Sequence, residues 1–344
     1  MVTSKRKQVA EQAGVSEATV SRVMNGIGPI KEETKRKVLE AAEALGYFPN
    51  AIAKSFVTQR SGNIGVSLPS VPNVRLFSTY YFSEILSGIG FEVQKHGYGL
   101  LLQFREWEGK PDFALPFHTR KIDASLILGV RMGGAEEEAA AELEREGMPF
   151  CLIGSRGSSP SFSAVDADHC EGTGKAVRHL VEQGFRRLAF VNGPLVYSNS
   201  VDRQQGFEAE IKRQGLDVAD VLYLEGNYSR SSGLELAAQL YAQRDRFDAI
   251  VAGNDRMGIG IVQGLKERGM LAGNDYGIVG CDDSDASKIL EPPLTTVRVP
   301  FFEMGRAAAS RILEGLKSGE ARLEPFHETL PTELIIRESS LKAR

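Results

Sequence analysis

Residues 8–26 read QVAEQAGVSEATVSRVMNG, two short amphipathic helical patterns that are joined by a tight turn. Val9 and Ala13 recur at helical spacing and form the inner face of the first helix. Gly14 stands in the turn, where a left-handed backbone costs glycine least, and Ser16 is placed to cap the second helix. The layout predicts a helix-turn-helix, a motif whose second helix enters the major groove of DNA.

The second helix has an apolar face and a polar face. Its buried stripe is expected to consist of Val20, Val23 and Met24. The opposite face is free to meet a partner and holds Glu17, Ala18, Ser21 and Arg22. A third helix is expected between residues 32 and 46, with an apolar stripe of Val38, Leu39, Ala42 and Leu45. Together the three helices can close a small core.

Charge is divided unevenly along the 344 residues. Residues 1–60 hold ten Lys or Arg against six Glu, a net charge of +4. The whole chain carries −4, so residues 61–344, with 31 basic against 39 acidic residues, carry −8. A basic N-terminal segment followed by an acidic remainder indicates that residues 1–60 alone bind a polyanionic partner. The basic run at 35–37 fits an ordinary solvated surface equally well.

Several classes of protein are disfavoured. No run approaches the roughly 18 apolar residues of a membrane span, and the N-terminal basic run is followed by polar residues, so we expect a cytoplasmic protein without a membrane partner. Three distant cysteines, Cys151, Cys170 and Cys281, argue against a disulfide framework and a structural zinc site. The GTGK run at 172–175 lacks the Ser or Thr of a P-loop. We therefore expect no catalytic, metal or cofactor site.

From Ile64 onward, short apolar strands alternate with amphipathic helices, which predicts parallel sheets in two doubly wound lobes. The expected strands are 64–68, 99–104, 124–129 and 150–153 in the first lobe, and 188–191, 221–224, 249–252 and 277–280 in the second. The expected helices are 82–95, 136–146, 171–182, 201–213, 231–241, 256–267 and 301–316.

The chain resembles a full-length member of the lactose-repressor (LacI/GalR) family of bacterial transcription regulators. The resemblance rests on VAEQAGVSEATVSRVMNG, LEAAEALGYFPNAIAKSF, VNGPLVYSNSVDRQQGF, GIVGCDDSDASKILEPPLTTVRVP and TELIIRESS. It implies an all-α headpiece at 1–48, a hinge helix and linker at 49–62, and a two-lobed effector and dimerisation domain at 63–344, similar to periplasmic sugar-binding proteins. We expect the first lobe to comprise 63–161 and 294–322, and the second 162–293 and 323–344.

The resemblance implies how the headpiece meets DNA. Glu17 and Ala18 occupy the positions that vary with operator preference, and Arg22 completes the reading set, since Arg can bond the edge of guanine. Glu17 also suits the helix dipole, which leaves its role open. Positions that hold phosphates in the family correspond to Ser16, Thr19, Ser21, Asn25 and Thr34. Capping explains Ser16 and Thr34 as well.

The hinge segment departs from the family. Asn50, Ala53 and Phe56 are expected to contact DNA there, but the family usually has leucine where this chain has Phe56. A phenyl ring can also part stacked bases in the minor groove, as other apolar wedges do. Packing against the partner hinge helix is the alternative role for Phe56.

The resemblance also implies a small-molecule site between the lobes, at the carboxyl ends of the strands. Its expected residues are Tyr81, Phe82, Asn199, Arg203, Tyr228, Asn254 and Asp282. Arg203 would fork to ligand oxygens, Asp282 would accept from hydroxyl or N–H groups, and Tyr228 would stack on the ligand ring. Core packing is the alternative for Tyr81 and Phe82, whereas Asp255 and Asp283 more naturally cap helices.

These expectations describe a homodimeric repressor of carbohydrate-utilisation genes. It would bind a pseudopalindromic double-stranded operator at the bacterial nucleoid, with a small sugar as effector, either as inducer or as co-repressor. Gly154 replaces a carboxylate of lactose-type members, which argues against a galactoside. The alternatives are a repressor with a nucleoside or purine co-repressor, a transport-type sugar-binding protein, and a constitutive architectural DNA protein.

Overall fold

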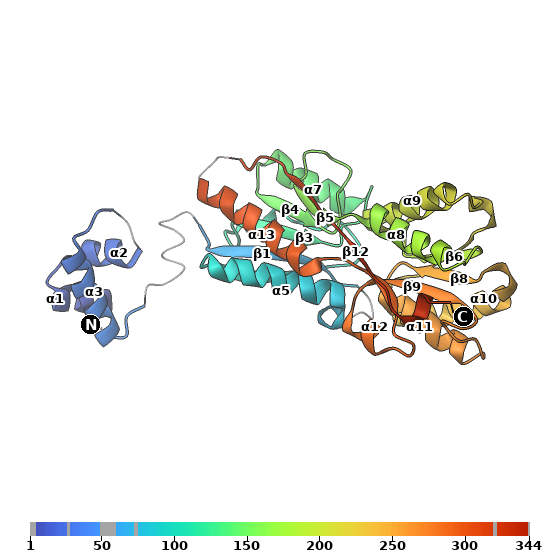
Figure 1. The fold of residues 1–344 in the computed structure, drawn as a ribbon. Helices are drawn as coiled ribbons and strands as arrows, with labels where there is room; N and C mark the ends of the chain where they lie inside the picture. The colour runs from blue at the N-terminus through green and yellow to red at the C-terminus, as the bar shows by residue number, and fades with distance from the viewer. Residues whose placement is uncertain (1–4, 26–27, 49–59, 72–74, 319–321, 343–344) are drawn as a thin grey trace. The chain divides into compact units, whose positions relative to one another are not determined.

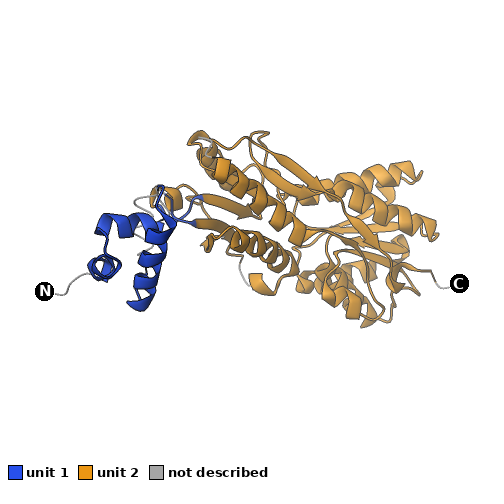
Figure 2. Cartoon of the chain, turned by 60° about the vertical axis from the view of Figure 1, so that its left-hand side comes forward, with its two compact units in different colours: residues 1–62, 120–123 blue, residues 63–119, 124–344 orange. Residues whose placement is uncertain are grey.

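The computed structural model of the protein describes residues 5–25, 28–48, 60–71, 75–318 and 322–342. The chain forms two compact units, one of residues 1–62 with 120–123 and one of residues 63–119 with 124–344 (Figure 2). Asp123 groups with the first unit because its carboxylate accepts hydrogen bonds from Ser61 N at 2.6 Å and Gly62 N at 2.8 Å.

The first unit contains the three predicted helices: α1 (Lys5–Ala13), α2 (Glu17–Asn25) and α3 (Glu32–Ala44). Val9, Val20 and Val38, one from each helix, are fully buried at the centre of their common core. Gly14 has a φ of +67°, which confirms the left-handed turn. The expected burial of Leu39 is wrong: it is 45% exposed, and Ala41, three residues after Val38, lies in the core instead.

The second unit consists of two lobes, each built on a six-stranded sheet (Figure 1). The first sheet has the order β11-β5-β4-β3-β1-β2 and is parallel throughout. Its strands are β1 (Asn63–Pro69), β2 (Gly99–Arg105), β3 (Ala124–Leu128), β4 (Phe150–Ile153), β5 (Ala164–Ala167) and β11 (His327–Leu330). Helices of this lobe are α5 (Tyr80–Lys95), α6 (Leu115–His118), α7 (Ala135–Arg145) and α13 (Phe301–Ser318), preceded by the 3-10 turn η1 (Leu76–Ser78).

The second sheet has the order β12-β10-β9-β8-β6-β7. Its strands are β6 (Leu188–Asn192), β7 (Leu222–Glu225), β8 (Ala249–Ala252), β9 (Gly277–Asp282), β10 (Thr295–Arg298) and β12 (Glu333–Ile335). Its helices are α8 (His169–Glu182), α9 (Ser198–Arg213), α10 (Arg230–Ala242), α11 (Asp255–Lys266) and α12 (Asp285–Ile289), with 3-10 turns η2 (Val218–Asp220), η3 (Arg244–Arg246) and η4 (Glu338–Ser340). The edge strand β12 is antiparallel to β10, an exception to the expected parallel pairing.

The sheet pairing moves the expected lobe boundaries. β5 pairs with β4 in the first sheet, although the second lobe was expected to begin at residue 162. β10 pairs with β9 in the second sheet, and β11 returns to the first, so these two assignments also change. The chain crosses between the sheets after β5, after β10 and between β11 and β12. Figure 1 shows the crossing segments side by side.

Side chains alternate between the two faces of the first sheet, as the two-residue period of strands requires. Leu126 and Leu128 of β3 pack in the cluster that also contains residues of α5 and α13. Ile127, between them in sequence, packs in a separate cluster with residues of α7. The helices therefore cover both faces, and the carboxyl ends of the strands are left for loops.

Candidate functional site

The predicted residues of the second lobe form one connected group. Arg203 lies on α9 with only 4% of its surface exposed, and its Nη1 donates to Tyr228 Oη at 3.3 Å. The Tyr228 hydroxyl donates in turn to Asn199 Oδ1 at 3.2 Å and is also hydrogen-bonded to Ser200. Asn254 Nδ2 donates to the backbone oxygen of Tyr228 at 3.1 Å. Two of the predicted side chains, those of Asn199 and Arg203, thus meet at the hydroxyl of a third, Tyr228, and a fourth, that of Asn254, bonds to the backbone of Tyr228.

Two neighbouring residues have roles other than those expected. The N-cap of α11 is Asn254, whose Oδ1 accepts from Met257 N at 2.9 Å, and not Asp255. Asp255 is fully buried and accepts hydrogen bonds from Ser284 and Thr296. Asp283 does not cap α12 either, since its carboxylate pairs with Arg298 and Arg337.

Charge is concentrated and desolvated in this group. Burial, together with the carboxylate of Asp255, raises the pKa of Asp282 well above its ordinary value. Burial alone would lower the pKa of Arg203. The electrostatic interactions of its guanidinium with Cys281, Tyr228 and Asp282 are together larger than this effect, and the pKa is raised. Within the described part of the chain, Arg203 Nε is buried and has no hydrogen-bond partner. An unpartnered buried donor is costly, so the site is suited to an external acceptor.

In the first lobe, Tyr81 lies at the start of α5 and its hydroxyl donates to Ile153 O, at the end of β4, at 3.2 Å. Burial raises the pKa of this phenol, which therefore stays protonated. Phe82 is buried in the main core of the lobe, in edge-to-face contact with Tyr81 at 4.8 Å between ring centroids. The core-packing alternative therefore describes the position of Phe82.

Tyr81 accounts for the absence of a carboxylate at position 154. Gly154 has a φ of +67°, and a Cβ on it would lie 2.5 Å from Tyr81 Oη. A longer side chain at this position would have to displace the phenol and adopt a strained backbone. The tyrosine hydroxyl thus occupies the space beside Gly154.

Sequence reasoning missed a second buried group, on β5. Asp166 Oδ1 accepts from Ala167 N at 2.8 Å and lies 3.3 Å from His169 Nε2, whereas its buried Oδ2 has no partner among the described residues. Burial, with the nearby charge of Arg203, lowers the pKa of His169, so its ring is neutral at pH 7. The strand that carries Asp166 has no apolar run, so its sequence pattern contains no signal for the group.

A third group, also missed, lies at the carboxyl ends of β1, β2 and β3. Arg105 is buried and donates to Glu136 Oε1 at 2.7 Å and to Leu128 O at 2.7 Å. Arg131 pairs with the other oxygen of Glu136 at 3.2 Å, and its guanidinium lies 4.8 Å from the centre of the Trp107 ring. Trp107 therefore belongs to this ion-pair network, where arginine stacks on an aromatic face.

Loops of the two lobes contact each other near these groups. Met132 N donates to Val196 O at 2.8 Å. Arg156, which follows β4, forms an ion pair with Asp202 on α9, and its backbone N donates to Ser198 Oγ at 3.3 Å. The carboxyl ends of the two sheets therefore face one another in the second unit.

The headpiece residues are arranged around α2. Ser16 Oγ accepts from Thr19 N at 3.1 Å and thereby caps the helix, as expected. Glu17 forms an ion pair with Arg6 of α1 at 2.8 Å, so its carboxylate is partly engaged within the headpiece. Ala18 and Arg22 are exposed, whereas Thr34 is half-buried at the start of α3.

Other predicted DNA contacts are tied to the helix or belong to segments that the structure does not describe. The Asn25 side chain donates to Ser21 O at 2.8 Å and to Ser21 Oγ at 3.3 Å. Asn50, Ala53 and Phe56 lie outside the described residues.

The free cysteines Cys151 and Cys281 are buried. No helix in the described ranges is long and apolar enough to span a membrane.

Two family models match the chain. Residues 7–50 match bacterial regulatory proteins of the lacI family, and residues 177–340 match the periplasmic binding protein-like domain. Catabolite control protein A of Priestia megaterium is 31% identical over 308 residues, which cover 89% of this chain and 90% of that protein.

Solved structures resemble the chain over nearly its full length. The lac repressor dimer bound to operator and the anti-inducer ONPF is 27% identical, with a TM-score of 0.82, and the alignment covers 97% of this chain and 98% of that chain. The complex of the transcriptional regulator CelR with cellobiose is 28% identical, with a TM-score of 0.74, and the alignment covers 97% and 99%.

Proposed function

Because the chain belongs to the LacI family of bacterial regulatory proteins, we propose that it represses carbohydrate-utilisation genes by binding a pseudopalindromic DNA operator as a homodimer. A small sugar or sugar-derived effector binds between the two lobes and changes the affinity for the operator. When bound, the protein is associated with the bacterial nucleoid. Its relatives are regulators, and we assign it no catalytic role.

DNA reading is assigned to the exposed face of α2. Arg22 is exposed on that face and reaches a guanine edge in this proposal, while the methyl group of Ala18 contacts thymine. Glu17 has a weaker claim to read a base, because Arg6 already pairs with its carboxylate. Phosphate contacts are assigned to Ser16, Thr19, Ser21, Asn25 and Thr34, whose small polar groups fix register without reading sequence.

The hinge segment is assigned further contacts with DNA, in the minor groove. We assign Asn50 and Ala53 to the minor groove and Phe56 to a wedge between base pairs. Such wedges kink DNA toward the major groove, and the kink depends on the base step that is opened. Because this chain has phenylalanine where the family usually has leucine, we expect it to prefer a different base step at the centre of its operator.

The observation that carries the effector proposal is the buried guanidinium of Arg203 with its unpartnered Nε. A ligand hydroxyl can accept from Arg203 and donate to a buried carboxylate, which Asp282 supplies in the same lobe. Tyr228 offers its ring, and Asn199 and Asn254 add amide groups beside it. Tyr81 closes the first-lobe side next to Gly154.

A sugar is favoured over a purine as effector. Two buried atoms among the described residues lack hydrogen-bond partners: the donor Arg203 Nε in the second lobe and the acceptor Asp166 Oδ2 in the first. A ligand between the lobes must therefore accept one hydrogen bond and donate another. Hydroxyl groups meet both demands because each one donates and accepts. The solved relative CelR is a complex with cellobiose, which is in keeping with this choice. A transport-type binding protein would have no use for the helix-turn-helix.

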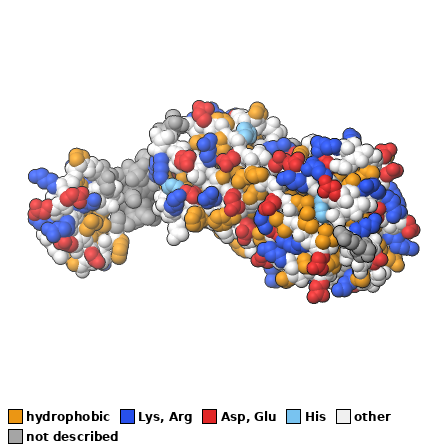
Figure 3. Space-filling model, in the orientation of Figure 1, with side chains coloured by type: hydrophobic (Ala, Val, Ile, Leu, Met, Phe, Trp, Pro, Cys, Tyr) orange, Lys and Arg blue, Asp and Glu red, His pale blue; other side chains and the backbone are white. Residues whose placement is uncertain are grey.

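The dimer is assigned to an exposed apolar face of the first lobe, formed by η1, α5 and β2. Phe77 and Phe104 are 57% and 55% exposed, and their rings pack edge to face at 6.0 Å between centroids. Figure 3 shows hydrophobic side chains gathered over α5 and α13, where Phe91 packs against Phe302 at 6.1 Å. An exposed aromatic patch of this kind marks an interface, and a second copy of the chain is its occupant here.

Two experiments test the proposal together. Selection of DNA by the purified protein from a random library should return a pseudopalindrome, and footprinting should protect both half-sites. A thermal-shift screen against sugars, sugar phosphates and nucleosides should show a rise in Tm for a sugar, since a ligand of the folded state stabilises it. If a nucleoside is the only compound that raises Tm, the purine alternative is favoured. If the selected DNA molecules share no sequence, the protein is not a sequence-specific regulator.

A further inference from the structure

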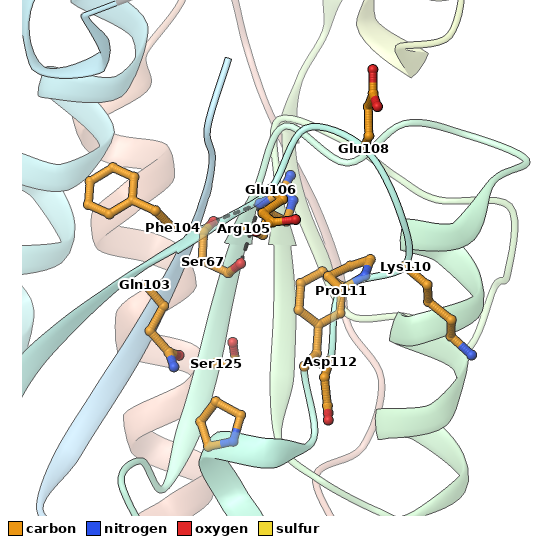
Figure 4. Close-up of a pocket in the computed structure, with 12 residues that line it drawn as sticks. Ser67, Gln103, Phe104, Arg105, Glu106, Glu108, Lys110, Pro111, Asp112 and Ser125 are labelled. Carbon is orange, nitrogen blue, oxygen red and sulfur yellow. Dashed lines mark hydrogen bonds between the residues drawn. The ribbon is translucent and has the colours of Figure 1, made fainter. Parts of the chain in front are cut away.

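A cavity of about 270 Å³ lies in the first lobe, away from Arg203 and the second sheet. It is bounded by β1, β2 and β3 on one side and by the segment 106–116, which links β2 to α6, on the other, and it opens to solvent beside the exposed residues Glu106 and Lys110 (Figure 4). Its lining includes the side chains of Ser67, Gln103 and Ser125 on the sheet and of Pro111 and Phe113 on the linking segment.

The cavity exists because one crossover of the sheet is almost without a helix. The β1–β2 and β3–β4 connections carry α5 and α7, of 16 and 11 residues, whereas the β2–β3 connection carries only the four-residue α6. Ser125 lies on the same sheet face as Ile127, which packs against α7. The corner of that face over β1 and β2 is thus covered by a loop alone.

The sheet surface in this corner is polar, which is unusual for a doubly wound sheet. Ser67 and Gln103 are direct neighbours in the β1–β2 register, and Ser125 is the neighbour of Gly65 in the β1–β3 register. Figure 4 shows their side chains grouped on the sheet side of the cavity. A full crossover helix would bury these groups against apolar side chains, and the cavity avoids that cost.

Two of the three polar side chains are left without a partner. Ser125 is only 2% exposed, yet neither its hydroxyl nor the amide of Gln103 forms a hydrogen bond with any described residue. The Ser67 hydroxyl receives only a long contact, 3.4 Å from Arg105 Nη1. Gln103 is half-buried, so both its amide and the Ser125 hydroxyl are available to a molecule in the cavity.

The charges around the cavity select a neutral ligand. Arg105 is held by Glu136 at 2.7 Å, and Lys110 is held by Glu142 at 2.6 Å. The remaining charged lining residues, Glu106, Glu108 and Asp112, are all acidic, and a phosphate would be repelled there.

Shape and chemistry point to a hydroxylated molecule. Amide and hydroxyl groups both donate and accept, as do the hydroxyls of a sugar. Phe113 and Pro111 provide an apolar wall against which the C–H face of a sugar ring can pack. The volume lies near the lower end of the range for ligand pockets, about 300 Å³, which suits a single ring rather than a disaccharide.

We propose that this cavity is a second small-molecule site, which binds a neutral molecule of monosaccharide size through Gln103, Ser125 and Ser67. It is separate from the proposed effector site at Arg203 and goes beyond the proposed function. Arg105 links the two regions, since it lines the cavity and donates to Gly129 O at 2.8 Å at the carboxyl end of β3.

The test uses the full-length protein with Arg203→Ala, which silences the effector site. Saturation-transfer NMR titrations up to 50 mM are run with D-glucose, D-galactose, D-ribose and D-xylose, and with glucose 6-phosphate and ribose 5-phosphate. At least one neutral sugar should saturate in the millimolar range, and the phosphates should bind at least tenfold more weakly. Ser125→Leu, which fills the cavity, should weaken that binding at least tenfold.

Gln103→Leu removes the amide at nearly constant volume and decides the matter if Ser125→Leu does not fold. Ser231→Leu, at an exposed serine of α10, is the matched control and should leave binding unchanged. Absence of binding by all four sugars, equal binding in Gln103→Leu, or equal binding of the phosphates would overturn the proposal. Effector action on operator affinity is measured separately, so its failure is distinguishable from failure here.

Discussion

Gly154 lies on the first-lobe side of the proposed effector site and has no side chain between its backbone and Tyr81. Its backbone is left-handed, and a Cβ on it would lie 2.5 Å from Tyr81 Oη, so there is no room for a larger residue. Gly154→Ala should lower the free energy of unfolding by about 1 to 3 kcal/mol, from backbone strain and steric conflict together. Denaturant unfolding measures this change.

Gly133 provides the control for that substitution. It has a φ of +65°, but no atom lies within 4 Å of the place that a Cβ would take, so Gly133→Ala should cost only the strain, about 1 kcal/mol. Tyr81→Phe, which removes the hydroxyl, should recover part of the loss in the Gly154→Ala background. Equal losses for the two glycines, with no recovery, would mean that Tyr81 does not restrict position 154.

The buried carboxylates of Asp255 and Asp282 predict a pH effect. Burial raises the pKa of Asp255 to about 6, above the value of about 3.9 for an unfolded chain. The folded state therefore binds more protons in this window, and its stability falls as the pH rises from about 4 to about 6. Asp282→Asn removes an acidic group whose ionisation is disfavoured in this buried site, and it should raise the free energy of unfolding at pH 7.5 by about 1 to 2 kcal/mol relative to the native chain.

The same comparison at pH 4.5 is the control. Both carboxylates are largely protonated there, so the gain from Asp282→Asn should shrink. Urea unfolding of both proteins at the two pH values gives the four free energies. A gain that is as large at pH 4.5 as at pH 7.5 would show that the charge of Asp282 is not the cause.

The sequence predicted some residues of the buried groups and missed others, and the difference follows from where each residue lies in the fold. Arg203, Tyr228 and Asn254 lie close together because each follows a different strand of the second sheet, β6, β7 or β8, and the carboxyl ends of neighbouring parallel strands share one edge. Asp166 and Arg105 were missed because a buried charged residue looks, in sequence, like an exposed one. Their burial appears only in the fold, which also brings Glu136 of α7 to Arg105.

Among elements, α2 bears the assigned reading function. Arg22→Lys keeps the charge but loses the planar fork of guanidinium that matches a guanine edge. Affinity for the selected operator should fall about tenfold or more, or about 1 to 3 kcal/mol, whereas nonspecific DNA affinity should change little. Fluorescence anisotropy with operator and random duplexes measures both.

Arg36→Lys on α3 is the matched control, since Arg36 is exposed and pairs only loosely with Glu40 at 4.0 Å. It should leave both affinities unchanged. An equal loss for operator and random DNA in Arg22→Lys would assign Arg22 to the phosphates and remove it from base reading.

The elements themselves follow the sequence closely where the pattern is long. All eight expected strands and all seven expected helices of the two lobes are present, with ends that differ by a few residues. The four missed strands, β5, β10, β11 and β12, have three or four residues each and read AVDA, TTVR, HETL and ELI. Their pairing depends on neighbours that are far away in sequence, so local periodicity could not define the lobe boundaries.

At the scale of the whole molecule, the proposed dimer forms through the exposed apolar face at η1, α5 and β2. Phe104→Glu places a charge in this proposed interface and should convert the dimer into a monomer. Sedimentation equilibrium at micromolar concentration measures this. Ile289→Glu is the control, because Ile289 is 83% exposed on α12 of the other lobe and should leave the dimer intact. A dimer that survives Phe104→Glu would place the interface elsewhere.

In the proposed regulator, one chain couples a DNA-reading headpiece to a sugar site around Arg203. The most direct measurement is operator affinity by anisotropy, with and without the sugar that raises Tm, for the native protein and for Arg203→Ala. The native protein should show a sugar-dependent change of at least fivefold, which corresponds to about 1 kcal/mol of coupling. Arg203→Ala should bind the operator as the native protein does but show no response to sugar. An operator affinity that no sugar changes, or a full response in Arg203→Ala, would show that a sugar bound at Arg203 does not control DNA binding.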